Sequence, residues 1–475
     1  MIFQHYIAPI AQAIAAHPNR DVSYLREARV QANLEENIMF QFRRKPLQLL
    51  IACALASGAV GAARAADKSP LTFGVGGSEV TLYGHIDVSV DNVDNGLSSV
   101  AGAVGKNGAM TQLSSNLSYF GLRGSRELGD ELKAVFQFET LVEYSATPGS
   151  TSTDSQASKT GLGSRNSFVG LKGSWGAAKI GKTDAPYKTS TARMDPFSAT
   201  VGDYNSIMAN SGGDNRAEFD TRVPHSIWYE SPHFGGVNVG ILYSPGQNRS
   251  DTNDIIARGE PSCTGGNTGN VTTGTGGCND GSFGTLTSLS AAYAGGPLYA
   301  IAAYENHSKV NRTGDGPTVA SVGVADENAF KISAQYKFPT NTTANVIVER
   351  LRRDSPDPNF NERSHNATWI AITQQISPDN DIDFGWAHAG KTPGDPGTGP
   401  IDNVANMYSF EFKHHFEDKK TTWYVVAAEQ RNHIGAHYDL GASGHGVVVD
   451  CKDAANACFT GTTLKAISTG LQYNF

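Results

Sequence analysis

The chain ends in "TLKAISTGLQYNF", residues 463–475, where apolar and polar side chains alternate. One face carries Ile467, Leu471, Tyr473 and Phe475, and the other carries Ser468, Gly470, Gln472 and Asn474. A period of two predicts a β-strand with one apolar face. Chain termini are usually polar and loose, so the aromatic last residue indicates that this strand belongs to a sheet up to its end.

The composition favours a large β-structure over a helical membrane protein. The chain has 475 residues with 52 Gly, 17 Tyr and 21 Phe, 39% hydrophobic residues and a mean hydropathy of −0.32. After residue 66 no run of eighteen uncharged apolar residues occurs, so that part contains no candidate transmembrane helix. Membrane β-barrels escape hydropathy analysis because only alternate residues of each strand face lipid.

The one long apolar stretch lies near the start. Residues 39–65, "MFQFRRKPLQLLIACALASGAVGAARA", have a basic segment, an apolar segment and a small-residue end, the pattern of a secretory signal peptide cleaved before Ala66. We expect residues 1–38 to be an upstream segment with a misplaced start, a true N-terminal extension being the alternative. Residues 66–475 are expected to form the mature domain.

Charge and cysteine content narrow the partners and the compartment. Seven of 38 basic and four of 46 acidic residues precede Ala66, leaving 31 basic and 42 acidic residues. This excess of acids argues against nucleic acid as a partner. In an oxidising compartment, the pairs Cys263/Cys278 and Cys451/Cys458 predict two disulfides that close loops, because neither pair has the spacing of a zinc site.

From residue 79 onward, alternating segments of about ten residues are separated by two kinds of connection. Short turns are predicted at 127–131, 173–178, 231–236, 293–298, 337–343, 375–381 and 415–421. Long polar loops are predicted near 92–115, 145–160, 184–220, 246–284, 308–326, 354–364, 391–402 and 432–461. Seven turns and eight loops in strict alternation require sixteen strands. This arrangement predicts an antiparallel transmembrane β-barrel with short periplasmic turns and long extracellular loops.

The faces of the segments agree with a barrel around water. In "VTLYGHIDVSV", residues 80–90, the valines, Leu82 and Ile86 lie on one side and Thr81, Tyr83, His85, Asp87 and Ser89 on the other. Tyr408, Phe410, Phe412 and Phe416 repeat the pattern, with Glu411 and Lys413 inward. Closure removes every sheet edge, as a membrane requires, and sixteen strands leave an aqueous channel. Phe475 would then join the aromatic girdle at the periplasmic interface.

Several segments resemble the trimeric general-diffusion porins of Gram-negative outer membranes, especially the β-proteobacterial branch. The resemblance rests on "VTLYGHIDVSV" (80–90), "SYFGLRGSRELGDELKAVFQFE" (118–139), "SRNSFVGLKGSWGAAKIGK" (164–182), "RVPHSIWYESPHFGGVNVGILYS" (222–244) and "GLQYNF". It implies a homotrimer in outer-membrane lipid and lipopolysaccharide, without a cofactor. It also implies a C-terminal assembly signal, Leu471, Tyr473 and Phe475, that the barrel-assembly machinery reads.

The resemblance further implies a pore constriction made by the third loop, residues 184–220, folded into the lumen. The loop acids are Asp195, Asp203, Asp214, Glu218 and Asp220, with "MDPF" (194–197) at the inward turn. The matching basic wall positions are Arg123, Arg165, Lys182 and Arg222. Lys182 replaces the arginine usual there, and Pro224 and His225 also depart from the common pattern. Carboxylates facing cations would create a transverse field that orders water and favours small hydrophilic solutes and ions.

Three other functions would each need features of their own in the sequence. A substrate-selective channel would need stacked lumen aromatics, of which only Tyr83 is predicted inward. A barrel enzyme would need a nucleophile with its base, and no GxSxG motif occurs. An adhesin would use its loops.

Arg350, Arg352 and Arg353 approach the extracellular rim and suit lipopolysaccharide phosphates. His433, His437 and His445 are expected to be surface residues of a loop.

Overall fold

The structure is a computed structural model, and the chain divides into residues 1–66 and residues 67–475. The residues that it describes all belong to the second part. They are 71–94, 109–142, 144, 163–209, 219–245, 280–282, 284–312, 324–354, 364–391, 404–436, 438, 440 and 461–475. The predicted signal peptide and the segment before it lie outside the described residues.

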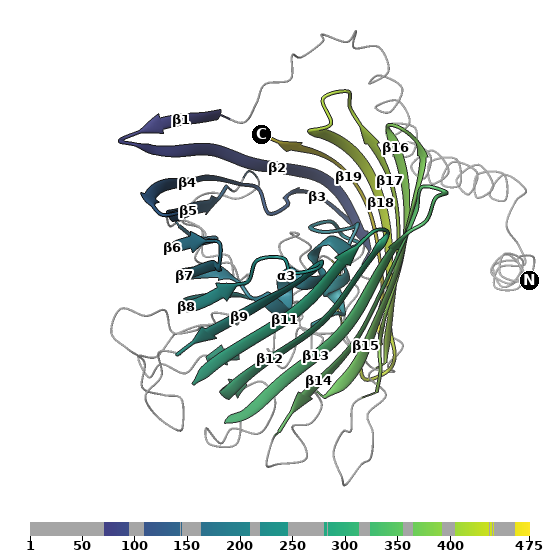
Figure 1. The fold of residues 1–475 in the computed structure, drawn as a ribbon. Coiled ribbons are helices and arrows are strands. Elements are labelled where there is room, and N and C mark those ends of the chain that lie inside the picture. The colour runs from purple at the N-terminus through teal and green to yellow at the C-terminus, as the bar shows by residue number, and fades with distance from the viewer. Residues whose placement is uncertain are drawn as a thin grey trace, which may run out of the picture. The chain divides into compact units, whose positions relative to one another are not determined.

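Antiparallel strands form one continuous sheet (Figure 1). In chain order they are β1 (Leu71–Val75), β2 (Ser78–Asp94), β3 (Ala109–Ser115), β4 (Tyr119–Gly129), β5 (Leu132–Leu141), β6 (Ser167–Gly173), β7 (Gly176–Asp184), β8 (Arg222–Glu230), β9 (Val237–Ser244) and β10 (Asp280–Ser282). They continue with β11 (Thr285–Gly295), β12 (Leu298–Arg312), β13 (Val324–Lys337), β14 (Thr342–Arg353), β15 (His365–Ser377), β16 (Asn380–Ala389), β17 (Ala405–His415), β18 (Thr421–Asn432) and β19 (Thr463–Asn474).

These strands occupy sixteen positions in a closed barrel. Strands β3 and β4 both pair with β2 and share one position, and β10 precedes β11 along β12. The ring closes where β19 pairs with β2, from Lys465 opposite Asp94 to Asn474 opposite His85. All seven predicted short turns join strands at the predicted places. The sixteen-stranded barrel predicted from the alternation is confirmed.

The short strand β1 was missed in the sequence. It forms a hairpin with β2 through Gly76 and Gly77, whose φ angles are +58° and +80°. Such positive φ angles suit glycine because it has no Cβ atom. Leu71 pairs with Leu82, so β1 lies along β2 beyond the end of β19. The sequence-based interpretation began the first strand after this hairpin.

Side-chain exposure separates the two faces of the wall. Large apolar residues on the predicted outer face are exposed, among them Val90 at 50%, Phe410 at 50% and Leu471 at 49%. Their neighbours on the inner face, such as Asp91 and Glu411, are buried. The apolar band therefore faces outward, as lipid requires, and polar side chains face the interior.

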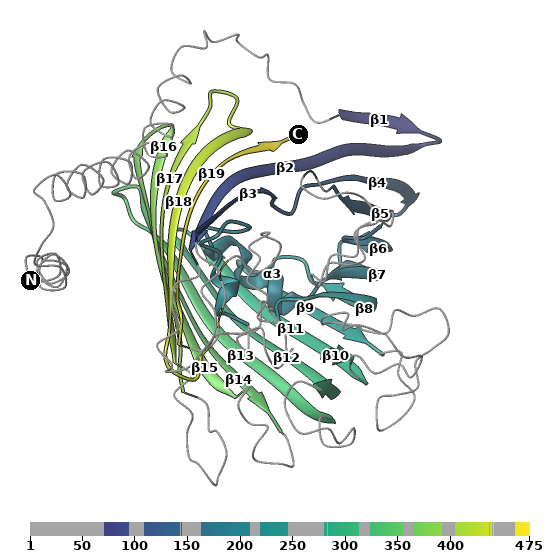
Figure 2. The same ribbon diagram turned by 180° about the vertical axis from the view of Figure 1, so that it is seen from behind.

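The connection between β7 and β8 is here called loop 3 (residues 185–221), and its described residues lie inside the barrel (Figure 2). Its described part contains α3 (Pro186–Thr191), η2 (Ala192–Met194) and η3 (Tyr204–Ser206). Met194, Phe197 and Tyr204 of loop 3 pack in one apolar cluster with Trp369 and Met407 of the wall. Among the described residues, no helix has the length and apolar character needed to cross a bilayer.

Candidate functional site: the lumen and loop 3

Loop 3 begins with a short helix attached to the wall. Pro186 stands in the first turn of α3, where its missing N–H costs no hydrogen bond. The next residue, Tyr187, donates its amide to the Ser288 hydroxyl at 2.9 Å and its hydroxyl to the Glu349 carboxylate at 2.7 Å. Lys331 lies 3.9 Å from the centre of the Tyr187 ring. The start of loop 3 is therefore fixed to β11, β13 and β14.

The middle of loop 3 is fixed through its backbone carbonyls. Trp369 donates its indole N–H to the Met194 carbonyl at 3.0 Å, and Ser409 donates its hydroxyl to the Gly202 carbonyl at 3.0 Å. Lys413 donates to the Pro196 carbonyl and also pairs with Asp383 at 3.1 Å and Glu411 at 3.0 Å. These contacts attach loop 3 to β15 and β17.

Two of the predicted loop acids, Asp195 and Asp203, lie within loop 3 rather than at its surface. Asp195 accepts hydrogen bonds from the amides of Phe197 at 3.0 Å and Tyr204 at 3.3 Å. Asp203 accepts from the amides of Ala199 and Asn205, both at 2.8 Å. Asp195 and Asp203 are only 7% and 1% exposed. Their burial does not support the prediction that they face the pore, because short acidic side chains satisfy turn amides locally.

Of the other three predicted loop acids, the structure describes Asp220. Asp220 is 5% exposed and receives Lys331 of β13 at 3.4 Å and the Tyr204 hydroxyl at 3.1 Å. Asp214 and Glu218 lie outside the described residues.

Burial raises the pKa of Asp195 well above its usual range, and the nearby Asp203 raises it further. Burial likewise raises the pKa of Asp203 to about 6.

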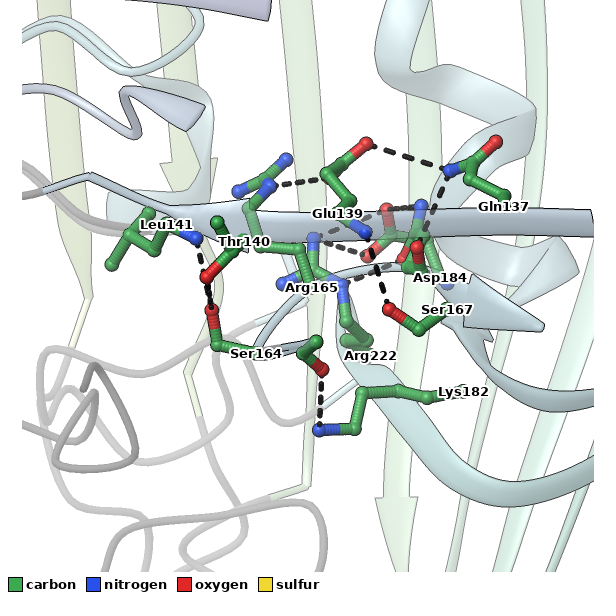
Figure 3. Close-up of polar contacts among 12 residues, drawn as sticks. Gln137, Glu139, Thr140, Leu141, Ser164, Arg165, Ser167, Lys182, Asp184 and Arg222 are labelled. Atoms are coloured by element: carbon green, nitrogen blue, oxygen red, sulfur yellow. Dashed lines mark hydrogen bonds and ion pairs between the residues drawn. The ribbon is translucent and has the colours of Figure 1, made fainter. Parts of the chain in front are cut away.

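Two predicted wall arginines, Arg165 and Arg222, come together beside Asp184 (Figure 3). Arg165 binds Glu139 with its Nε atom at 2.5 Å. Arg222 binds Asp184 at 3.1 Å and donates its Nε–H to the Asn166 side chain at 2.7 Å. Despite the bulge in β8 at Pro224 and His225, Arg222 therefore joins the cluster on β5–β8.

Tyrosine rings hold two of the guanidinium groups. The Arg165 guanidinium lies 4.3 Å from the centre of the Tyr119 ring, and that of Arg123 lies 4.9 Å from the Tyr83 ring. Tyr83 in turn donates its hydroxyl to Glu139 at 3.1 Å. A cation above an aromatic face is attracted by the ring quadrupole and loses little hydration. Inward Tyr119 shows that Tyr83 is not the single lumen aromatic that the sequence indicated.

Lys182 lies near Arg222 but outside the ion pairs of this group. Its ammonium donates to the Gly163 carbonyl at 3.5 Å, and none of its described contacts is an ion pair with Glu139 or Asp184. A register shift between Gly181 and Thr183 lies at this position. The structure thus brings together Arg123, Arg165 and Arg222 of the four predicted wall cations and leaves Lys182 at the edge.

Two loop 3 cations were missed in the sequence. Lys188 lies 3.5 Å from Asp184 and is 27% exposed. Arg193 is exposed, and its guanidinium lies 4.4 Å from the centre of the Tyr299 ring of β12. Gln335 donates to the Arg193 carbonyl at 3.3 Å. Both cations lie within "APYKTSTARMDPF" (185–197), the segment from which only Asp195 was predicted to face the pore.

Other predicted site residues have separate outcomes. The four cysteines Cys263, Cys278, Cys451 and Cys458, together with His437 and His445, lie outside the described residues. His433 is exposed, and among the described residues no three potential ligands form a metal site. Arg353 is 3% exposed and pairs with Glu327 at 3.1 Å, so its side chain lies on the inner face of the barrel and not on the outer face. Arg350 and Arg352 do lie on the outer face.

The C-terminal residues complete the ring. The Phe475 amide and carbonyl each bond Gly84 of β2 at 3.1 Å. The Phe475 ring lies over Gly84, because a Cβ atom there would come within 2.3 Å of it. Tyr473 and Phe475 stack at 5.9 Å with Leu471 exposed on the same face. These three residues form the outer side of the closing seam.

Comparison with known proteins supports the fold and the family. The major outer membrane protein P.IB of Neisseria gonorrhoeae is 29% identical over 171 residues, which are 36% of this chain and 44% of that protein. An outer membrane porin protein of Bordetella pertussis is 28% identical over 299 residues, 61% of this chain and 66% of that protein. The chain thus matches less than half the length of the Neisseria relative.

Solved structures share the architecture at lower identity. An anion-selective porin from Comamonas acidovorans superposes with a TM-score of 0.59 at 22% identity, covering 84% of this chain and all of that one. OmpF of Salmonella typhi superposes with a TM-score of 0.54 at 14% identity and covers 85% of this chain. The family model described as Gram-negative porin matches residues 50–435. The chain therefore belongs to the Gram-negative porin family of outer-membrane β-barrels.

Proposed function

We propose that this protein is a passive, water-filled channel for ions and small hydrophilic solutes across the outer membrane, and that its constriction favours anions. The channel follows from family membership and from a barrel of sixteen strand positions with a polar inner face. The ion preference rests on one observation. Among the described charges of loop 3 and of the wall cluster of Arg165 and Arg222 beside it, the cations are more exposed than the carboxylates.

The cations are Arg123, Arg165 and Arg222 of the wall and Lys188 and Arg193 of loop 3. The two carboxylates beside them are Glu139 and Asp184, whose side chains are 6% and 14% exposed. Their partners Arg165, Arg222 and Lys188 are 12%, 21% and 27% exposed. The more accessible charge is therefore positive, and a ring of basic side chains in a narrow pore favours anions.

This proposal replaces the acidic half of the predicted constriction. Asp195 and Asp203 would stabilise the turns of loop 3, and Asp220 would bind Lys331 beneath the loop. Arg193 would supply the charge that loop 3 presents to solutes. The anion-selective porin from Comamonas acidovorans is compatible with this reading, although the argument rests on the charges of this chain.

The assembly of the channel is also part of the proposal. We expect a homotrimer, as for OmpT of Vibrio cholerae, a structural neighbour with a trimer form and a TM-score of 0.50. The C-terminal residues Leu471, Tyr473 and Phe475 would be read by the barrel-assembly machinery during insertion. Neither property is needed for the charge argument.

Single-channel conductance of the refolded mature chain in a planar bilayer tests the channel itself. Stepwise, ohmic openings are expected, in groups of three for a trimer. A barrel that is folded by circular dichroism and heat-modifiability but conducts no current would contradict the proposal. Function would then lie in the long loops, as in an adhesin.

A further inference from the structure

Two wall arginines of the lumen are joined through tyrosine rings. The guanidinium of Arg123 lies over the Tyr83 ring, and that of Arg165 lies over the Tyr119 ring. The two rings contact each other edge to face, with their centres 6.3 Å apart. Guanidinium, ring, ring and guanidinium therefore follow one another without a gap along the inner face of β2 and β4.

A third pair of the same kind lies across the lumen. Arg193 of loop 3 is exposed, and its guanidinium lies 4.4 Å from the centre of the Tyr299 ring. Tyr299 belongs to β12, which is the seventh strand position after β4 in the ring of sixteen. The lumen therefore carries arginine–tyrosine pairs on two nearly opposite parts of its lining.

Two of these rings are fixed at their far ends. Tyr83 donates its hydroxyl to Glu139 at 3.1 Å, and Tyr299 donates its hydroxyl to the Ser190 carbonyl at 3.0 Å. The Tyr83 ring also lies on Gly121, where an added Cβ atom would come within 2.6 Å of it. Rings held in this way keep one side of each guanidinium covered, and the other side is left to the lumen.

Attraction of anions alone does not require this arrangement, because a lysine ammonium without a ring supplies the same charge. A guanidinium is planar and weakly hydrated, so its open side can stack on a flat π-system as well as attract a negative charge. Arg165 is already bound to Glu139 at 2.5 Å. Arg123 and Arg193 are exposed and have no ion-pair partner among the described residues. These two guanidinium groups are therefore available to a solute.

The three pairs are here called the arginine–tyrosine array, which consists of Arg123, Tyr83, Arg165, Tyr119, Arg193 and Tyr299. We propose that this array makes the channel favour flat aromatic carboxylates over other organic anions of the same charge. The proposal rests on the anion preference proposed above and adds the class of solute. The aromatic ring of the solute stacks on the open side of Arg123 or Arg193, and the positive charge of the array attracts its carboxylate. Such a contact at an exposed site changes the occupancy by roughly two- to fivefold, which biases diffusion without holding the solute in the pore.

Benzoate and cyclohexanecarboxylate are the matched probes, because both are monovalent carboxylates at neutral pH and only benzoate has an aromatic ring. The reversal potential of the refolded wild-type channel between the potassium salt of each acid and potassium chloride gives the permeability of each anion relative to chloride. We expect benzoate to be about threefold more permeant than cyclohexanecarboxylate. Equal permeability, in a channel that prefers chloride to potassium, would overturn this proposal and leave the anion preference intact. A channel that prefers potassium to chloride would remove the anion preference on which the proposal rests.

The double variant R123K/R193K separates stacking from charge and from pore size, because it keeps both charges and removes both planar groups. Its two carboxylates should be almost equally permeant, whereas chloride should still permeate faster than potassium. A wild-type preference for benzoate in R123K/R193K would overturn the proposal, because a flat solute would then be favoured by pore size alone.

The matched control is R126K/R350K, which changes two exposed arginines away from the lumen. Arg126 lies three residues after Arg123 and therefore on the other face of β4, and Arg350 lies on the outer face of β14. This control should keep the wild-type preference for benzoate, and an equal loss in both double variants would overturn the proposal. If R123K/R193K fails to refold, R123K and R193K are measured singly. Each should show part of the loss, and no loss in either would overturn the proposal as well.

Discussion

Tyr187 at the start of loop 3 donates its hydroxyl to Glu349 of β14 at 2.7 Å, across 162 positions of sequence. The other oxygen of the same carboxylate accepts the amide of Ala209 at 2.7 Å. One buried carboxylate therefore holds residues 187 and 209 of loop 3, and Lys331 supplies the compensating charge. A loop fixed at both places presents Arg193 to the lumen in a defined position.

Substitution of Glu349 should loosen loop 3. Hydrogen bonds to a charged group are worth about 1.5–3 kcal/mol each, and removal of the carboxylate also takes away one of the two negative charges that face Lys331, the other being Asp220. We expect E349A to conduct with frequent subconductance fluctuations, whereas Y187F, which removes one hydrogen bond, should do so less often. Single-channel noise at fixed voltage measures this, and quiet E349A channels would show that the loop is held elsewhere.

The acids of loop 3 predict a pH dependence. The pKa of Asp203 is about 6 in the folded protein, whereas an unfolded aspartate titrates near pH ~4. The folded loop therefore binds more protons between these values, so its free energy of unfolding falls as the pH rises from about 4 to about 6. Hydrogen exchange at the Ala199 and Asn205 amides, corrected for intrinsic rates, should show protection declining across this window. The decline should vanish in D203N, and protection that rises instead would refute the assignment.

The tyrosine rings that contact the wall arginines should affect the ion preference of the channel, in addition to the charges themselves. A partly desolvated cation–π contact is worth about 1 kcal/mol, or roughly a fivefold change in the population of the oriented guanidinium. We expect Y119L to lower the permeability ratio of chloride to potassium, since Arg165 loses its support. Y119F keeps the ring and should behave as the wild type. A wild-type reversal potential in Y119L would mean that Glu139 alone positions Arg165.

The closing seam requires a glycine opposite the last residue. A Cβ atom on Gly84 would come within 2.6 Å of two Phe475 ring atoms, so G84A must displace the ring from the wall. We expect G84A to refold into detergent micelles more slowly and to lower yield, as removal of Phe475 would. The heat-modifiable fraction on electrophoresis measures this. G74A, at a glycine without a positive φ angle and with its nearest heavy atom 4.0 Å from an added Cβ, tests for a general effect of glycine removal.

The barrel could be predicted from the sequence because its signals are local. Alternation at a period of two and turns such as "ELGDE" (127–131) depend on neighbouring residues only, and sixteen positions followed from counting them. The hairpin of β1 escaped because Leu71–Val75 is short, and its "GG" turn falls just before the first recognised strand.

The interior of the lumen was less predictable because its contacts join distant segments. Asp195 looked like a pore charge, yet its carboxylate binds the amides of Phe197 and Tyr204 within loop 3. Arg193 was visible as a cation beside Asp195, but its place in the lumen depends on Tyr299, over a hundred residues away. The Arg165 and Arg222 positions came from family resemblance, and their carboxylate partners Glu139 and Asp184 emerged only with the fold.

The reversal potential of the refolded wild-type channel in a potassium chloride gradient tests the central claim most directly. Excess positive charge at the level of loop 3 predicts that chloride permeates faster than potassium. The reversal potential should have the sign that corresponds to this preference. The preference should shrink in R123Q/R193Q, which removes the two cations without described ion-pair partners, and should persist in R126Q, at the short-turn end of β4. A wild-type potential of the opposite sign, with potassium permeating faster, would contradict the account.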